Sequence, residues 1–176
     1  MLVARAVSAE DTRAFGELIR RHQSQVRNFL RKLAGDVALA DDLAQECFLH
    51  AWNKLATYSG QGTFIGWLMK VAYTTFLQSK RKSKRYGEIL EQAGHAADAG
   101  SGSYTEPRDE VADLGKLLAV LDEEERAIVV MSYACGMSHR EISDATGQPV
   151  GTVKSIIFRG KEKIRNRFEI KDHKHG

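Results

Sequence analysis

Three carboxylates, Asp41, Asp42 and Glu46, lie close together in a segment with the apolar spacing of a helix. Clustered carboxylates can hold Mg²⁺, so these residue types would allow a metal-dependent nuclease. The sequence shows no obvious catalytic partner beside them, and we therefore predict no catalytic residue, no metal site and no cofactor. We favour a second role for this acidic group, which is to bind a basic partner protein.

The rest of the segment supports that second role. The residues expected to face the core are Leu39, Leu43, Cys47, Ala51 and Leu55. The carboxylates share the other face with Gln45, Leu49 and the edge of Trp52. An acidic face with exposed leucine and tryptophan is typical of a docking surface for a basic helix. An alternative stays open: Asp41 and Asp42 lie near a helix N-terminus, where they would stabilise the helix dipole without binding any partner.

A phenylalanine among basic residues marks a second candidate surface, in PVGTVKSIIFRGKEKIR at residues 149–165. As a helix, this segment has one apolar side, formed by Val150, Val153, Ile156, Ile157, Gly160 and Ile164. The remaining surface carries Thr152, Lys154, Ser155, Phe158, Arg159 and Lys161. Phe158 could pack on a thymine methyl while Arg159 or Lys154 reaches guanine acceptors. A contact of Phe158 with the core, through Phe168 or the tail, stays open as the alternative.

The elements before this helix indicate how it is positioned. Asp122 with Glu125, and Ser138 with Glu141, have the spacing of capping boxes that begin two helices. Gly136 and Gly147 are placed to end those helices. A short helix, a turn ending at Pro149 and a longer basic helix predict a helix-turn-helix over residues 138–165.

A third candidate surface lies before and along a helix predicted from Thr63 or Phe64 to Arg85. The loop TYSGQGT, which includes Tyr58, offers one aromatic ring and backbone amides suited to an unstacked base. The side chains expected to project together from the helix are Lys70, Tyr73, Thr74, Leu77 and Arg81. SKRKSKR, at residues 79–85, would contact phosphates, although such a run is often only a solvated face.

The whole chain of 176 residues is predicted to be all-α, with two small helical domains. The N-terminal domain, residues 1–85, would contain a helix from Ala9 to Leu33 capped by Ser8, a second to about Ala56, and the third helix. Residues 86–108 read as a flexible acidic linker, and residues 109–176 as the second domain.

Charge divides the chain in the same way. The net charge is +7 over residues 1–85, −9 over residues 86–125 and +5 over residues 126–176. Two basic lobes around an acidic segment suggest two contacts with a polyanion, although solvated faces would give the same balance. No apolar run suits a membrane span and no secretory signal is visible, so we expect a cytoplasmic protein without membrane contact. Cys47 and Cys135 are expected to be reduced thiols.

Two long segments resemble one protein family. LDEEERAIVVMSYACGMSHREISDATGQPVGTVKSIIFRGKEKIR is similar to region 4 of the extracytoplasmic-function (ECF) sigma factors of bacterial RNA polymerase. DDLAQECFLHAWNKLATYSGQGTFIGWLMKVAY is similar to region 2 of the same sigma-70 family. The resemblance implies a factor that is not a catalyst, and that directs initiation by binding core polymerase, through its β′ and β subunits, and promoter DNA. It also implies an inhibitory anti-sigma factor.

The family assigns roles to three sets of positions. Those that match its polymerase-binding face are Asp41, Asp42, Gln45, Glu46, Phe48, Leu49 and Trp52. Those that match its reader of the single-stranded minus-10 element are Tyr58, Thr63, Lys70, Tyr73, Thr74 and Arg81. Those that match its reader of the minus-35 element are Thr152, Lys154, Ser155, Phe158, Arg159 and Lys161.

This chain departs from the family pattern at several positions. Many members have Arg-Asn where this chain has Tyr73 and Thr74, and an Asp where it has Gln78. In the recognition helix, the family's usual Arg and Ala are replaced by Ile156 and Gly160. Family rules for promoter sequence are therefore not transferred. A helix-turn-helix regulator that never acts as a polymerase subunit is the alternative function, although it would have no use for the acidic face.

Overall fold

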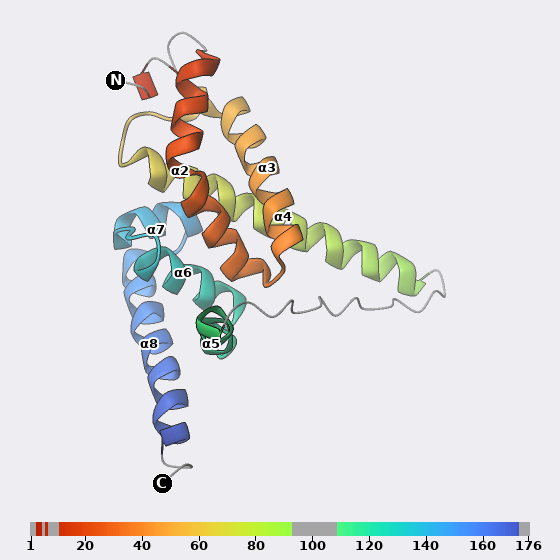
Figure 1. Cartoon of the computed structure of the whole chain (residues 1–176), viewed down its shortest axis with the longest axis vertical. Helices are drawn as coiled ribbons and strands as arrows, with labels where there is room; N and C mark the ends of the chain where they lie inside the picture. The colour runs from red at the N-terminus through yellow and green to blue at the C-terminus, as the bar shows by residue number, and fades with distance from the viewer. Residues whose placement is uncertain (1–2, 5, 7–10, 93–108, 173–176) are drawn as a thin grey trace.

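The computed structural model describes residues 3–4, 6, 11–92 and 109–172, and all regular structure in this part of the chain is helical. The N-terminal domain comprises α2 (Thr12–Ala34), α3 (Val37–Asn53), the short 3₁₀ helix η1 (Leu55–Thr57) and α4 (Phe64–Gln92). The C-terminal domain comprises α5 (Asp109–Leu118), α6 (Glu123–Tyr133), α7 (His139–Thr146) and α8 (Val150–Asp172) (Figure 1). The predicted all-α class is confirmed.

The first hairpin of helices is set by local caps. Asp11 begins α2, because its carboxylate accepts hydrogen bonds from the backbone N–H groups of Arg13 and Ala14. The prediction of a start at Ala9 was therefore wrong, and Ser8 lies outside the described residues. Gly35 ends α2 in the left-handed conformation, with φ 71°, and Asp36 at once caps α3.

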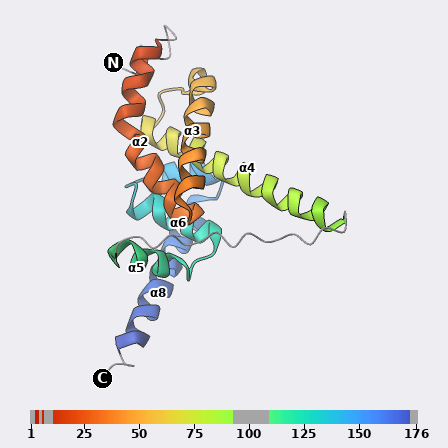
Figure 2. The ribbon, with the colours of Figure 1, turned by 45° about the vertical axis from the view of Figure 1, so that its right-hand side comes forward.

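The long helix α4 continues beyond its predicted end. It runs to Gln92, so the expected linker does not begin at residue 86. The residues after Arg85 include Glu88, Ile89 and Leu90, which are compatible with a helix, and the single glycine among them does not stop it. The far half of α4 extends away from the other helices in both views (Figures 1 and 2). The rest of the predicted linker, residues 93–108, lies outside the described part.

The C-terminal domain follows its predicted punctuation closely. Both capping boxes form, with Asp122 and Glu125 at the start of α6 and Ser138 and Glu141 at the start of α7. Gly147 ends α7 with φ 77°. The Pro149 carbonyl then accepts the first helical hydrogen bond of α8, so the helix-turn-helix is confirmed.

A glycine allows the closest contact between α6 and α8. A Cβ atom added at Gly160 would lie 2.7 Å from Val129 Cγ2 and 3.6 Å from Leu121 Cδ2. Gly160 itself is buried, so α8 packs on α6 through bare backbone at this point. Glycine lowers the stability of the helix itself, but at this position it permits the close packing of α8 on α6.

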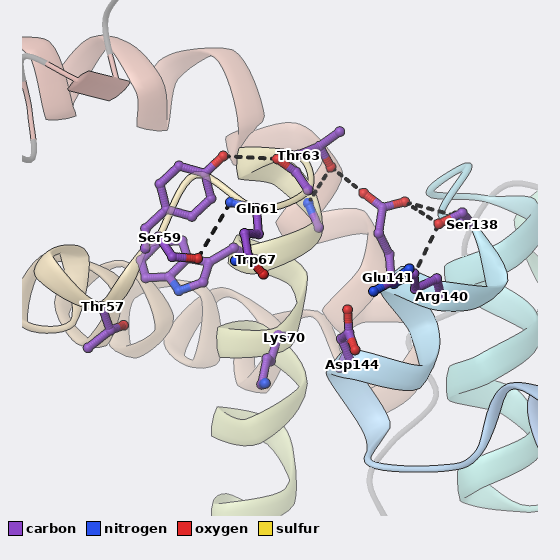
Figure 3. A pocket seen from close by; sticks show the side chains of 14 residues that line it. Thr57, Ser59, Gln61, Thr63, Trp67, Lys70, Ser138, Arg140, Glu141 and Asp144 are labelled. Atoms are coloured by element: carbon purple, nitrogen blue, oxygen red, sulfur yellow. Dashed lines mark hydrogen bonds between the residues drawn. The ribbon is translucent and has the colours of Figure 1, made fainter.

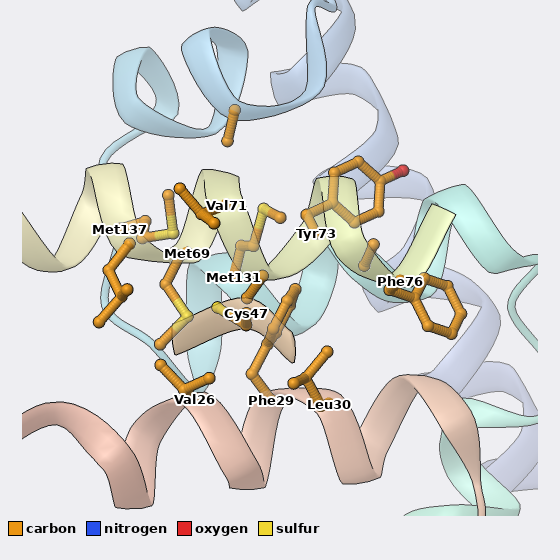
Figure 4. Packing of buried hydrophobic residues seen from close by; sticks show 14 of the residues in the cluster. Val26, Phe29, Leu30, Cys47, Met69, Val71, Tyr73, Phe76, Met131 and Met137 are labelled. Carbon is orange, nitrogen blue, oxygen red and sulfur yellow. The ribbon is translucent and has the colours of Figure 1, made fainter. Parts of the chain in front are cut away.

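The two domains share one hydrophobic cluster. Helix α4 packs against α7, and α2 packs against α6. Met131 and Met137 of the C-terminal domain belong to the same buried cluster as Phe29, Met69 and Val71 of the N-terminal domain (Figure 4). We call this packing of the two domains the closed arrangement. Within the described residues, no helix has the length and apolar character that crossing a membrane requires.

Candidate polymerase and nucleic-acid interfaces

The face of α8 that was expected to read DNA is open to solvent. Val153, Ile156 and Ile157 are buried, as predicted, whereas Phe158 is 66% exposed. Lys154, Arg159 and Lys161 are exposed beside it, and Thr152 is half-buried. An exposed phenylalanine with flanking cations can contact a thymine methyl and the phosphates around it. Phe158 therefore makes no core contact among the described side chains, and its alternative partners, Phe168 and the tail, lie outside them.

The hydroxyl of Ser155 has a more limited role than the sequence suggested. It donates to the Gly151 carbonyl of the preceding turn at 3.0 Å. A base or phosphate would have to compete with this intrahelical bond for the proton. Its lone pairs remain able to accept a hydrogen bond.

The acidic face of α3 is present, but two of its carboxylates, Asp41 and Glu46, already have intramolecular partners. Arg31 of α2 lies 3.2 Å from Asp41 Oδ1, and Arg27 lies 4.0 Å from it. Glu46 lies 3.8 Å from Lys82 Nζ and 3.9 Å from His50 Nε2. The surface therefore mixes charges of both signs, and α2 and α4 contribute the positive ones.

The apolar residues of the same face differ in exposure. Leu49 is 66% exposed and is the most prominent apolar side chain of the face. Phe48 and Trp52 are half-buried, and the Trp52 ring packs 5.0 Å from that of Phe15. Leu39, which was expected in the core, is 42% exposed, because it lies in the first turn of α3 where little covers it.

His50 is a residue of this region that sequence reasoning missed. Its Nδ1 lies 3.1 Å from Thr75 Oγ1, and Thr75 is a buried residue of α4. The i, i+4 spacing from Glu46 could have drawn attention to it. Among the described residues no three His, Cys, Asp or Glu side chains lie close enough to hold a metal ion.

The loop between η1 and α4 is built around aromatic rings. The Tyr58 ring packs 5.7 Å from the ring centroids of both Phe64 and Trp67, and its hydroxyl donates to the Gly62 carbonyl at 3.1 Å. Gly60 and Gly62 both have positive φ, near 77° and 78°, which a loop this tight requires. Tyr58 stays half-exposed, as a stacking platform must.

Along α4 the predicted minus-10 residues do not share one environment. Lys70 and Arg81 are exposed, and the Thr74 hydroxyl donates to the Lys70 carbonyl at 2.8 Å. Tyr73, which was expected to project from the surface, is only 5% exposed. Burial raises the pKa of Tyr73 to about 12, and the nearby charges of Glu124, Glu123 and Asp122 add to the rise. These three acidic residues belong to the C-terminal domain, which therefore lies against this part of α4.

Thr63 also meets the C-terminal domain. Its hydroxyl accepts from the Gly66 N–H at 3.1 Å, which caps α4, and donates to Glu141 Oε1 at 2.5 Å. Figure 3 shows Glu141 of α7 pointing at Thr63, and both side chains line a pocket of about 580 Å³. The pocket is lined by the loop with Tyr58, by Lys70 of α4, and by Arg140 and Asp144 of α7.

The hydrogen bonds to Glu141 also favour its charged form. The Thr63 hydroxyl, and after it the Ser138 backbone N–H, hold the pKa of Glu141 below its ordinary value of 4.5. Glu141 is thus a carboxylate at neutral pH, and it serves both the capping box of α7 and the contact between domains.

Comparison with known sequences identifies two family segments in this chain. Residues 18–86 match "Sigma-70 region 2" and residues 112–164 match "Sigma-70, region 4". The chain is 33% identical over 161 residues to ECF RNA polymerase sigma factor SigE of Mycolicibacterium smegmatis, covering 87% of this chain and 61% of that protein. It is 27% identical over 176 residues to the ECF RNA polymerase sigma-E factor of Escherichia coli, covering 93% of this chain and 91% of that protein.

Solved structures share the fold. RpoE, which was solved with the anti-sigma factor NepR from Bartonella quintana, is similar with a TM-score of 0.72 at 21% identity, over 89% of this chain and 97% of that one. CnrH, which was solved with the cytosolic domain of CnrY, is similar with a TM-score of 0.72 at 25% identity, over 96% of both chains.

Proposed function

Because this chain belongs to the ECF sigma factors of the sigma-70 family, we propose that three of its surfaces bind core RNA polymerase, the minus-10 element and the minus-35 element. The family is not a class of enzymes. Its members direct core RNA polymerase to promoters, and that is the function of this chain. The proposal concerns which residues carry each contact.

One observation carries the assignment of function. A region 2 segment and a region 4 segment occur in one chain, in the order that a sigma factor requires. A helix-turn-helix regulator would need only the second, so it leaves residues 18–86 without a role. Since bacterial core polymerase is cytoplasmic, the proposal also implies a cytoplasmic protein.

For the polymerase contact we assign α3. Leu49 would be its apolar centre, with Phe48 and Trp52 behind it and Asp42, Gln45 and Glu46 around it. Asp41 would contribute less, because Arg31 already pairs with it. A large apolar side chain ringed by charges is the usual arrangement of an energetic centre in an interface.

For DNA we assign two separate readers. The exposed side chains of α8, with Phe158 at their centre, would read the minus-35 duplex in the major groove. Tyr58 and its loop would hold an unstacked minus-10 base, while Lys70 and Arg81 contact phosphates along α4. Tyr73 remains among the proposed minus-10 residues, but it is buried in this structure and could contact DNA only after it becomes exposed.

A further partner is an anti-sigma factor, which the family resemblance implies and which we propose for this chain. CnrH, with a quarter of its residues identical, was solved with the cytosolic domain of CnrY. A partner of this kind would be detected by co-purification with the tagged chain.

Reconstitution with core RNA polymerase tests the assignment of function. Purified chain and core enzyme should yield transcripts from a randomised-promoter library, and sequencing of those transcripts should show one upstream and one downstream element. A chain that binds duplex DNA but yields no specific transcript with core polymerase would contradict it. The variant Leu49→Ala should lose core binding while keeping duplex binding by α8.

A further inference from the structure

One ion pair with a buried carboxylate joins the two helices behind the proposed minus-35 surface. The Lys163 Nζ atom of α8 lies 2.6 Å from Glu125 Oε1 and 2.7 Å from Glu125 Oε2. Glu125 belongs to the first turn of α6, and α6 packs on α8. Among the residues whose side chains the structure describes, Glu125 is the one charged residue that is buried, at 8% exposure. A buried carboxylate requires a counter-charge close by, so Glu125 holds the ammonium group of Lys163 in place.

Glu125 is itself held in position by the capping box of α6. Its Oε2 accepts a hydrogen bond from the Asp122 N–H at 3.2 Å, and its own N–H donates to Asp122 Oδ1 at 2.8 Å. The carboxylate is therefore fixed at a helix start and is not at the tip of a free side chain. Lys163 is thereby attached to the backbone of α6 through one carboxylate.

Lys163 differs in its partner from the cations that we assign to DNA. Lys154, Arg159 and Lys161 are exposed, and none of them pairs with a carboxylate in the part of the chain that the structure describes. The side chain of Lys163 is 47% exposed, but its ammonium group already contacts both oxygens of Glu125. A contact of Lys163 with a phosphate would leave that buried carboxylate without its counter-charge, which is costly.

A second contact between the same helices lies one turn away. An added Cβ at Gly160 of α8 would lie 2.7 Å from Val129 Cγ2 of α6. The ion pair lies one turn further along α8 and one turn nearer the start of α6. The contact at Gly160 limits how closely the helices approach, whereas the ion pair attracts them. Together the two contacts fix the orientation of α8, because a rotation of the helix about one contact would displace the other.

We propose that Lys163 is a positioning residue of the minus-35 reader, and that its ion pair with Glu125 holds α8 in the orientation that base recognition requires. This inference rests on the proposed function of α8. Arg159 lies one turn before Lys163, with Phe158 beside it, so a change in how α8 packs on α6 moves both side chains relative to the bases. Lys163 then contributes to base preference and releases no counterion from DNA, since Glu125 neutralises its charge.

The salt dependence of binding distinguishes this role from a phosphate contact. The test variant is Lys163→Met with Glu125→Gln, which removes one charge of each sign and keeps an acceptor for the Asp122 N–H. The probe is the duplex that the full-length wild-type chain selects from a library of short duplexes with randomised sequence. On this duplex the double variant should keep the wild-type slope of log K against log salt. Lys161→Ala, the matched control on the same helix, should reduce that slope by about 1.

Base preference tests the positioning itself. The second set of probes differs from the selected duplex at single base pairs. At the base pairs whose preference Phe158→Ala also alters, the double variant should lose about fivefold of the wild-type discrimination. Lys161→Ala should weaken binding to all these duplexes alike. Lys163→Arg should keep the wild-type preference, because a guanidinium can donate to both oxygens of Glu125.

A single substitution provides the same test in case the double variant fails to fold. Glu125→Gln keeps the acceptor for the Asp122 N–H, and thermal unfolding should show that this variant is folded at the assay temperature. It should lose base preference as the double variant does, because both remove the same charge pair. If Lys163 binds phosphate instead, its release from Glu125 should tighten binding to every duplex.

The possible results separate this proposal from the one on which it rests. A salt slope reduced as in Lys161→Ala, or an unchanged base preference in the double variant and in Glu125→Gln, would overturn the positioning role. The assignment of α8 to the minus-35 element would stand in that case. A wild-type chain that prefers no duplex of the library would overturn that assignment, and the role of Lys163 with it.

Discussion

Replacement of Phe158 by alanine distinguishes two roles of this side chain, contact with DNA bases and packing in the core. Phe158 is 66% exposed, so about a third of its surface, on the order of 70 Å², is covered in the folded state. At about 25 cal/mol per Å² that area contributes at most about 1.7 kcal/mol, and the β-carbon that alanine keeps lowers the loss. We therefore expect Phe158→Ala to cost less than about 1.5 kcal/mol of stability.

The neighbouring residue is the control. Ile157 is 9% exposed, and its replacement by alanine should cost about 2–5 kcal/mol. Thermal unfolding of both variants compares the two costs. The affinities for duplexes that differ at single minus-35 base pairs then measure how strongly each variant discriminates between bases. Phe158→Ala should lose about 1–3 kcal/mol of discrimination at one position.

A third variant isolates the phosphate contribution. Lys161→Ala should weaken all duplexes alike and reduce the slope of log K against log salt by about 1. Phe158→Ala should leave that slope unchanged. If Phe158→Ala instead unfolds as readily as Ile157→Ala and keeps its sequence preference, the assignment of Phe158 to DNA is wrong.

The remaining predictions concern the other surfaces. Asp42→Ala with Glu46→Ala should weaken binding to core polymerase in a titration, with under about 1 kcal/mol lost in thermal unfolding, because exposed carboxylates contribute little to stability. Unchanged affinity would remove α3 from the interface. Tyr58→Ala should reduce permanganate-reactive open complex and flatten minus-10 preference more than Thr74→Ala, and the reverse order would contradict our division of roles. Because the folded-state pKa of Glu141 is lowered, its contribution to the closed arrangement is present above pH 4.5 and is lost as pH falls through the lowered value. Glu141→Gln should thus have a larger radius of gyration than wild type at neutral pH, and this difference should vanish in acid.

The features that sequence analysis predicted well are local ones. The capping boxes of α6 and α7 depend on residues three apart, so their pattern is visible without any tertiary information. The buried side of α8 follows from helical period alone, and with it the exposure of Phe158. The same reasoning misplaced the start of α2, because Asp11 caps this helix and pattern analysis did not weigh it.

The features that it missed depend on contacts between distant segments. Tyr73 shares a helical face with Lys70, yet the acidic start of α6 lies near it and the side chain is buried. Glu141 was identified as a cap, but its second partner, Thr63, is 78 positions away. The helical periodicity of the sequence carries no information about a contact between such distant residues. The relative placement of the two domains could not be predicted for the same reason.

The bare backbone of Gly160 has a consequence for how promoter preferences should be compared. The position follows directly after Phe158 and Arg159, so it fixes the height and tilt at which α8 carries them. A methyl group there would meet Val129 and push the helix outward, and the two side chains would enter the groove at another depth. Relatives with alanine at this position could keep identical base-contacting residues and still prefer other bases. We therefore expect promoter preference to depend on the rear of this helix as well as on its front, so an alignment of contact residues alone would not transfer it to this chain.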